Sequence, residues 1–328
     1  MVICFYYYLL FGLWSNLEKT DDMQKVLVVY YSQTGQLKAI IDSVLAPVVG
    51  GDGVNVTYAE IKPKHAYPFP WTAYQFCDVF PESFAGIPCE LLPLEFDPDE
   101  HYDLVILAYT VWYLSPSIPI ASFLQSPQAE KIIKGRPVIT LIGCRNMWLL
   151  AQERIKRILG ELGGRLIGNI VLTDRANNLV GVLTIAVWML TGRKDRFMHV
   201  FPRPGISEGD IREARRFGEY IQRALTQSPI DLDQSELNAA GAVHVDPALL
   251  LMEKRVAKVF NIWSNFIRQK GSGGDPNRRR RVRCFMVYLI AAVIVLAPLA
   301  SVAAGLLRRI KKDRLEAETA YFSQNVPS

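Results

Sequence analysis

Hydrophobic residues along the chain fall into two patterns that alternate. Short runs of β-branched and aromatic residues are typical of buried strands, and stretches with apolar residues every three or four positions are typical of helices. Strands are predicted at residues 26–31, 55–61, 104–108, 138–142 and 167–172, and helices at 37–45, 118–124, 148–162 and 207–225. Strands that alternate with helices are joined by right-handed crossovers and form parallel sheets. The pattern therefore predicts an α/β domain over residues 23–227, with a five-stranded, doubly wound parallel sheet.

Two stretches interrupt this alternation. Residues 62–96 form a long connection, rich in proline and aromatic residues, between the second and third strands. Residues 176–200 contain an apolar stretch at 179–190 that is followed by a basic cluster. At about 12 residues that stretch is too short to cross a bilayer, so we expect a buried or interfacial helix. Both stretches are predicted insertions that together form an apolar entrance to the site of the domain.

The N-terminal end of the chain differs from the sheet domain. Residues 1–22 begin with an apolar run that is too short for a span and lacks the features of a secretory signal. Met23 directly precedes the first strand. Residues 1–22 are therefore interpreted as an extension outside the domain, either from an upstream start or as a segment that dips into a membrane.

Beyond the sheet domain the chain becomes polar and then strongly apolar. Residues 228–283 are predicted to form a linker and an amphipathic helix. Residues 284–307 contain no charged residue and reach about 36 Å as a helix, which predicts a transmembrane segment. Pro298 leaves a kinked span and a re-entrant hairpin open. A single span places Tyr321, in the basic polar tail at 308–328, on the far side of the membrane.

Composition and charge narrow the classes of function. The net charge of +5 comes from lysines and arginines that flank the apolar segment 284–307, so we expect no nucleic-acid partner. The five cysteines form no CxxC pair, which favours a reducing compartment over a disulfide framework. The four histidines show no metal-ligand spacing, and no metal site is predicted.

The segment after the first strand carries the clearest chemical signal. It joins a buried strand to the start of a helix, where backbone amides and hydroxyls converge and the helix dipole favours an anion. It has neither the Gly-Lys-Ser/Thr ending of a nucleoside-triphosphate loop nor the G-x-G-x-x-G of a dinucleotide site. An ordinary strand–helix turn is the alternative. We predict a phosphate-binding loop made of Ser32, Gln33, Thr34, Gly35 and Gln36.

Two further loops are expected at the same edge of the sheet, because ligands of open α/β sheets bind beyond the carboxyl ends of the strands. One loop follows residue 108 and the other follows residue 142. Cys144, in the second of these loops, is interpreted as a small loop residue rather than a nucleophile, since no histidine stands beside it in the sequence.

Two segments, KVLVVYYSQTGQ and YDLVILAYTVWYLSPSIPIASFL, resemble the flavodoxin family. They are similar to its first strand with the phosphate loop, and to its third strand with the following flavin loop and helix. The resemblance spans roughly residues 25–225 and implies a flavodoxin-like fold that binds FMN through the first loop. It implies contacts with the isoalloxazine ring from Thr110, Val111, Trp112, Tyr113, Leu114, Gly143, Cys144, Arg145 and Asn146. Leu37 departs from the family pattern, which has a hydroxyl residue there, and a hydrogen bond worth roughly 1.5–3 kcal/mol is thereby lost.

A narrower resemblance rests on the loops CRNMW and SQTGQ together with the aromatic insertion. These are similar to flavodoxin-like proteins of the dialkylresorcinol condensing enzyme type, from bacterial pigment pathways. The resemblance implies that a flavin oxidises a cyclic diketone, made by a ketosynthase, to a resorcinol, with a ketosynthase or acyl carrier as partner. Tyr113 and Arg145 are the candidate catalytic residues for the enol proton, and Arg145 also for stabilising an anionic flavin or an enolate oxygen.

The expected protein is a membrane-anchored, FMN-dependent oxidoreductase that acts on a hydrophobic small molecule. Its sheet domain is expected to face the cytoplasm at the inner membrane of a bacterium, with the lipid bilayer as a partner. Two alternatives remain open. One is a quinone reductase that uses NAD(P)H, and the other is a flavodoxin-like electron carrier or scaffold without catalysis.

Overall fold

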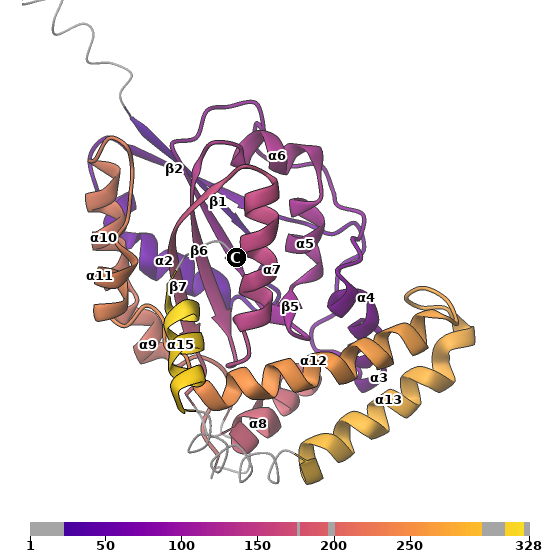
Figure 1. The fold of residues 1–328 in the computed structure, drawn as a ribbon. Helices are drawn as coiled ribbons and strands as arrows, with labels where there is room; N and C mark the ends of the chain where they lie inside the picture. Colours follow the sequence, from indigo (N-terminus) through magenta and orange to yellow (C-terminus); the bar gives the residue numbers. More distant parts are fainter. Residues whose placement is uncertain (1–22, 176–177, 196–200, 297–311, 325–328) are drawn as a thin grey trace, which may run out of the picture.

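A computed structural model describes residues 23–175, 178–195, 201–296 and 312–324. Its centre is a five-stranded parallel sheet in the order β2-β1-β3-β6-β7 (Figure 1). The strands are β1 (Gln24–Tyr30), β2 (Val54–Glu60), β3 (Leu104–Tyr109), β6 (Pro137–Cys144) and β7 (Arg165–Thr173). Numbered within the sheet alone, this is the 2-1-3-4-5 order of flavodoxin-like folds. The predicted five-stranded α/β sheet is confirmed.

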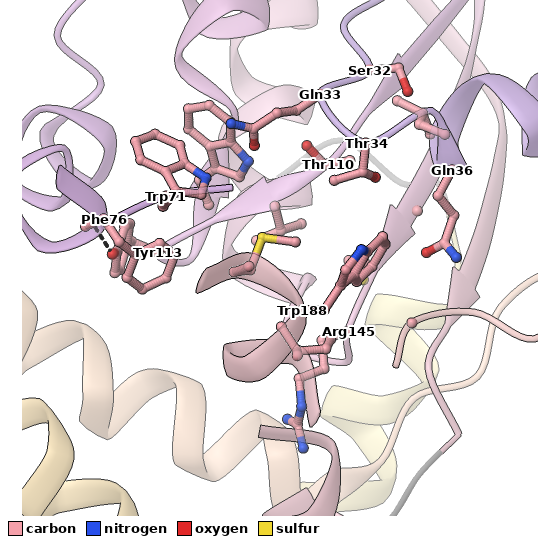
Figure 2. Close-up of a pocket in the computed structure, with 18 of the residues that line it drawn as sticks. Ser32, Gln33, Thr34, Gln36, Trp71, Phe76, Thr110, Tyr113, Arg145 and Trp188 are labelled. Atoms are coloured by element: carbon pink, nitrogen blue, oxygen red, sulfur yellow. Dashed lines mark hydrogen bonds between the residues drawn. The ribbon is translucent and has the colours of Figure 1, made fainter. Parts of the chain in front are cut away.

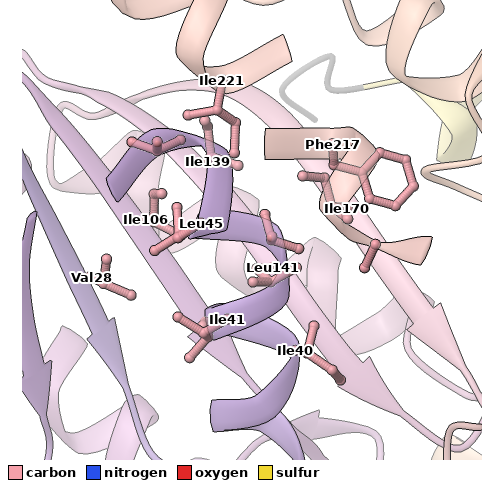
Figure 3. Close-up of a cluster of buried hydrophobic side chains, with 14 of the residues drawn as sticks. Val28, Ile40, Ile41, Leu45, Ile106, Ile139, Leu141, Ile170, Phe217 and Ile221 are labelled. Carbon is pink, nitrogen blue, oxygen red and sulfur yellow. The ribbon is translucent and has the colours of Figure 1, made fainter. Parts of the chain in front are cut away.

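Helices cover both faces of the sheet, and the strands alternate between them. On one face lie α2 (Gln36–Val49), α9 (Glu208–Glu213) and α10 (Arg215–Leu225); on the other lie α5 (Ile118–Leu124), α6 (Pro127–Ile133) and α7 (Leu149–Glu161). Val28 of β1 points into the first core beside Ile41 and Ile106 (Figure 3), whereas the next residue, Val29, belongs to the second core. Because both faces are covered, the inner strands β1, β3 and β6 are mostly apolar runs, whereas the edge strand β2 is only partly buried.

Helix α10 lies unusually close to α2. A Cβ placed on Gly218 of α10 would lie 1.9 Å from the carbonyl oxygen of Val44 on α2, so a residue with a side chain does not fit there. The neighbouring Phe217 and Ile221 are buried in the same core (Figure 3). This close contact holds α2, and with it the loop that precedes α2, firmly against the sheet.

The two insertions form separate elements beside the carboxyl ends of the strands. The first contains α3 (Ala73–Asp78) and α4 (Phe80–Ala85), and the second contains α8 (Asn178–Thr191). The loop after β3 forms a small antiparallel hairpin of β4 (Val111–Trp112) and β5 (Ser115–Pro116). All of these lie next to the predicted ligand edge of the sheet.

The C-terminal part of the chain is more structured than the predicted linker and helix. Its elements are α11 (Gln234–Ala239), α12 (Pro247–Arg268), the 3-10 turn η2 (Pro276–Arg278), α13 (Arg279–Ala291), the π-helical turn η3 (Ala292–Leu296) and α15 (Lys312–Ser323). Leu237 and Ala242, within the stretch predicted as a polar linker, are fully buried in the core of the sheet. Helices α12 and α13 form an antiparallel hairpin along the side of the domain (Figure 1).

The predicted transmembrane segment at 284–307 is wrong. In the parts of the chain that the structure describes, no helix is both long and apolar enough to cross a membrane. Helix α13 ends at Ala291, and Phe285 is completely buried and stacks on Phe80 with 4.1 Å between the ring centroids. The apolar run therefore supplies a core contact of the protein itself. Residues 297–307 of the predicted segment, and the N-terminal extension 1–22, lie outside the described residues.

The described part of the tail lies against the sheet domain. The Tyr321 hydroxyl on α15 donates a hydrogen bond to Glu153 of α7 (2.8 Å), and Phe322 is buried in one of the two cores of the sheet. This position disagrees with the single span, which places Tyr321 on the opposite side of a membrane from the domain.

Candidate functional site

A cleft of about 230 Å³ opens where the carboxyl ends of β1, β3 and β6 meet. The three predicted loops come together in it, joined by residues of both insertions (Figure 2). Of the predicted site residues, it is lined by Ser32, Gln33, Thr34, Gln36, Thr110, Val111, Trp112, Tyr113, Gly143, Cys144 and Arg145. Gly35, Leu114 and Asn146 are not part of the lining: Gly35 lies at the start of α2, and Leu114 is buried in a core outside the sheet.

The first loop ends at the N-terminus of α2. Gly35 has a left-handed φ of 77°, which glycine adopts without strain, and its position supplies no side-chain cap. The Ser32 hydroxyl accepts the amide of Lys38 at 3.3 Å. The helix dipole and the first amides of α2 are therefore directed at the polar end of the cleft, which suits an anion.

Of three polar side chains in this loop, two bond to neighbouring segments and the third lines the cleft. The Gln36 side chain pairs with both backbone groups of Ile206 (3.1 and 3.2 Å), and Gln33 donates to the carbonyl of Pro68 (2.8 Å). These two glutamines thus fasten neighbouring segments to the loop. Thr34 lies between them in Figure 2 and, like Thr110, lines the cleft. The Thr34 hydroxyl is therefore the side-chain group of this loop best placed to meet a ligand.

Tryptophan rings form the apolar end of the cleft. Trp112 of β4 meets Trp71 of the first insertion edge to face, with 5.9 Å between the centroids and an angle of 80°. Trp188 of α8 lines the opposite part of the cleft (Figure 2) and contacts Phe69 edge to face at 6.0 Å. The backbone amide of Trp71 donates to the carbonyl of Met189 (2.8 Å), which joins the two insertions at the mouth.

The sequence indicates that both insertions form an apolar entrance, but it does not single out Trp71, Phe76, Ile185 or Trp188, all of which line the cleft. The many aromatic residues of the first insertion indicate in the sequence that this insertion forms a wall of the cleft. The uniformly apolar α8 carries no comparable signal for one particular residue, because any of its faces could be buried.

Tyr113 is held by the first insertion. Its hydroxyl donates to the carbonyl oxygen of Phe76 at 2.6 Å, and its backbone has a left-handed φ of 49°. Burial raises the pKa of the Tyr113 hydroxyl well above 10. The hydroxyl proton of Tyr113 is thus engaged in a hydrogen bond with the backbone. This geometry favours a positioning role for Tyr113 over proton transfer.

Cys144 is the last residue of β6, and Arg145 follows it directly. The Arg145 guanidinium donates to the side-chain oxygen of Asn146 (2.9 Å), and Gly181 of α8 leaves room for it, since a Cβ there would lie 3.0 Å from Nη2. Burial lowers the pKa of Arg145, and the nearby charge of Asp174 opposes this shift. Burial raises the pKa of the Cys144 thiol, so that the unreactive protonated form predominates. Arg145 is the one charged side chain among the described residues of the lining.

No protein-family model matches the chain, and no curated protein matches it. Several solved structures are similar to it. A flavoprotein in complex with FMN from Lactobacillus acidophilus NCFM is 19% identical over 45% of this chain and 93% of its own, with a TM-score of 0.37. A flavodoxin from the domain Archaea is 13% identical over 62% and 100%, also with a TM-score of 0.37. A putative flavoprotein from Bacteroides eggerthii DSM 20697 is 17% identical over 46% and 89%, with a TM-score of 0.36. At these TM-scores the assignment to the flavodoxin-like fold rests on the strand order.

Proposed function

We propose that the cleft binds FMN and that the protein is a flavin-dependent oxidoreductase. The observation that carries this proposal is the division of one cleft into two chemically different ends. The N-terminus of α2, where Gly35 supplies no side-chain cap and Thr34 lies beside it, suits a phosphate. The rings of Trp71, Trp112 and Trp188 suit a flat aromatic group. Both ends lie beyond the carboxyl ends of the strands, where this class of sheet binds ligands.

The residues of the cleft fit FMN, but the volume of the cleft and the side chain of Leu37 limit how it can bind. The volume of about 230 Å³ is below the roughly 300–1,000 Å³ of most small-molecule sites, so we expect part of the flavin to lie at the open mouth. Leu37, which replaces the hydroxyl residue of the family pattern, is buried in the core of the sheet. The phosphate would then depend on Thr34, Ser32 and the backbone amides of α2.

We propose further that the substrate is an apolar ring compound, a cyclic ketone that is oxidised to a phenol of the dialkylresorcinol type. A bound flavin would supply the hydride acceptor. The aromatic and aliphatic lining favours an apolar substrate. The guanidinium of Arg145 bonds to Asn146 and points away from Thr34 and Trp188 (Figure 2), so it has to turn toward the cleft to meet an enolate oxygen. None of the described lining residues is a carboxylate or a histidine. Oxidation of a cyclic diketone to a resorcinol removes a hydride and a proton from neighbouring ring carbons. We propose that water at the open mouth accepts this proton, which the adjacent carbonyl group makes acidic.

The phosphate end is tested by Thr34→Ala in the full-length protein. We expect the dissociation constant for FMN, measured by flavin fluorescence, to rise about tenfold, because a hydrogen bond to a charged group is lost. Riboflavin, which lacks the phosphate, should bind both proteins equally. Thr57→Ala, on the half-buried edge strand β2 away from the cleft, is the matched control and should bind FMN as the unmodified protein does. Failure of the unmodified protein to bind FMN would refute the cofactor assignment.

The substrate class is tested by stopped-flow reduction of the FMN-loaded protein. We expect a cyclic 1,3-diketone with alkyl chains to bleach the flavin faster than NADH or NADPH does. Rapid reduction by a nicotinamide followed by reoxidation with a quinone would instead establish the quinone reductase. Reduction by neither class of donor would leave the electron carrier as the function.

A further inference from the structure

Glu253 is a buried carboxylate outside the sheet domain that reaches into its ligand edge. It belongs to α12 and is completely buried. Its two oxygens accept the backbone amides of Leu149 (3.3 Å) and Leu150 (2.9 Å), which form the first turn of α7. Among the described residues no cation forms an ion pair with Glu253. An unpaired carboxylate is costly to bury, so this arrangement needs an explanation beyond packing.

Helix α7 has no cap of its own. The residue at its N-cap position is Trp148, whose side chain makes no capping hydrogen bond. The first amides of a helix need acceptors, and short polar side chains at the N-cap usually provide them. Glu253 takes over this role from about a hundred residues further along the chain, and its negative charge also suits the positive end of the helix dipole.

The segment capped in this way is the third loop of the cleft. Gly143, Cys144 and Arg145 line the cleft, and α7 begins only four residues after Arg145. The loop is fixed at one end by β6, where the amide of Asp174 donates to the carbonyl of Cys144 at 3.2 Å. Glu253 fixes the other end. The position of the loop thus depends on the C-terminal helix.

We propose that Glu253 is a positioning residue of the cleft, which caps α7 and thereby holds residues 143–148 in the conformation that the ligand of the cleft requires. The alternative is that the cap stabilises the fold without affecting the ligand. The two readings differ in what happens when the charge of Glu253 changes.

That charge changes close to neutral pH. Burial raises the pKa of Glu253 to about 7, and the amides that donate to it oppose the shift. The titratable groups that face it from β3 and β6 are Tyr109 and Cys144, and burial raises the pKa of both, so both stay protonated. On its own helix Lys254 pairs with Glu318 of α15 at 3.0 Å.

Arg145, beside Cys144, donates to the neutral Asn146, and two charged side chains of α7 form an ion pair with each other. On α7, Lys156 pairs with Glu153 at 3.1 Å. Ionised Glu253 makes charge-assisted hydrogen bonds to Leu149 and Leu150, which are stronger than those of the protonated acid. Loss of these bonds while Glu253 stays buried would raise its pKa further, because the amides lower it. The loop is therefore held more firmly at pH 8 than at pH 6, although burial of the ionised carboxylate makes the whole fold less stable at pH 8.

The test rests on the proposed binding of FMN and compares three full-length proteins: the unmodified chain, Glu253→Gln and Ser264→Ala. Ser264 is buried on the same helix and donates to the carbonyl of Pro81 (3.0 Å), away from residues 143–148. We expect the FMN affinity of the unmodified protein to rise about fivefold more between pH 6 and pH 8 than that of Glu253→Gln. Ser264→Ala should keep the full pH dependence. The phosphate of FMN titrates near pH 6, but it does so equally in all three proteins.

A second measurement needs no flavin. Hydrogen exchange at the amides of Leu149 and Leu150, corrected for intrinsic rates, should show greater protection at pH 8 than at pH 6 in the unmodified protein and in Ser264→Ala. Glu253→Gln should show low protection at both values. If no protein binds FMN, the proposed cofactor is refuted and this exchange pattern alone decides whether Glu253 positions the loop. Two results would overturn the proposal. The first is that the exchange of Glu253→Gln depends on pH as that of the unmodified protein does. The second is that Glu253→Gln differs from the unmodified protein in exchange but not in its binding of FMN.

Discussion

The sheet and the C-terminal hairpin, α12 to α13, are held in the protein by different kinds of contact. Aliphatic and aromatic side chains that alternate along the strands fill most of both cores of the sheet. The polar side chains of Thr140, Gln152 and Asn169, also buried there, bond to one another. The hairpin also has an apolar contact, in which Phe80 of α4 meets Phe260 and Phe285 with centroids 4.9 and 4.1 Å apart. At the turn of the hairpin, however, the fully buried Arg278 is bound by two carboxylates of the first insertion.

These contacts differ in specificity. Apolar contacts supply most of the stabilisation but tolerate shifts, whereas a buried charge requires its partner at one place. Arg278 donates from Nε to Asp78 (2.8 Å) and from Nη1 to Glu82 (2.6 Å). The sheet is therefore specified by a repeated pattern, and the place of the hairpin is specified by a few individual polar residues. Variants in the two regions should consequently fail in different ways.

The largest effect is expected in the core of the sheet. Phe217→Ala removes a buried ring between α10 and the sheet (Figure 3) and should lower the free energy of unfolding by about 3–5 kcal/mol. Urea denaturation should show one cooperative transition at lower concentration. Ile262→Ala, at a position that is 68% exposed, is the control and should change stability by less than about 0.5 kcal/mol. A loss confined to α10 would contradict the view that the sheet and its helices unfold together.

The next effect should be confined to the hairpin. Arg278→Ala leaves Asp78 and Glu82, which are only 13% and 16% exposed, without their cation. Removing one partner of a buried ion pair costs about 3 kcal/mol or more. We expect faster hydrogen exchange and proteolysis in α12 and α13, with little change in the strands. Arg280→Ala, at an exposed neighbouring position, is the control. Equal acceleration of exchange in the strands would show that the hairpin and the sheet form one cooperative unit.

The same difference explains what could be predicted from the sequence. Strand β3, predicted at 104–108, is observed at Leu104–Tyr109, because a strand buried on both faces is a continuous apolar run. Because the strands are parallel, their following loops had to meet at one edge. The bonds of Glu253 and Arg278 join residues about 100 and 200 positions apart, and such single pairs leave no periodic pattern in a sequence.

The misassigned segment at 284–307 has the same physical origin. Its lack of charge is typical of a span, but the ring of Phe285 fills a cluster formed by residues of α4 and α12. Hydrophobicity alone does not distinguish a helix that faces lipid from one that packs on protein. Phe285 is a residue of this run that packs on protein, and its partners are far away in the sequence.

A pH-dependent effect should separate Glu253 from the apolar cores. Its pKa is about 7 in the folded protein and near 4.5 when exposed, so the folded state binds the extra proton. The stabilisation that results is fully present below pH 4.5 and is lost as the pH rises through 7, by at most about 3 kcal/mol. Urea denaturation at pH 5 and pH 8 should show a larger decrease for the unmodified protein than for Glu253→Gln. Identical decreases in both proteins would mean that Glu253 does not titrate in this range.

The smallest effect tests whether one neutral hydrogen bond contributes to the place of the hairpin. Ser264→Ala removes the donor to the carbonyl of Pro81 and leaves that acceptor buried, at a cost of about 1 kcal/mol. Hydrogen exchange in α12 should accelerate about fivefold, since 1 kcal/mol corresponds to that factor, while the strands exchange as before. Asn265→Ala, at the exposed neighbouring position, should leave exchange in α12 unchanged. If Ser264→Ala destabilised the hairpin as much as Arg278→Ala, burial of the polar group rather than its charge would determine where the hairpin binds.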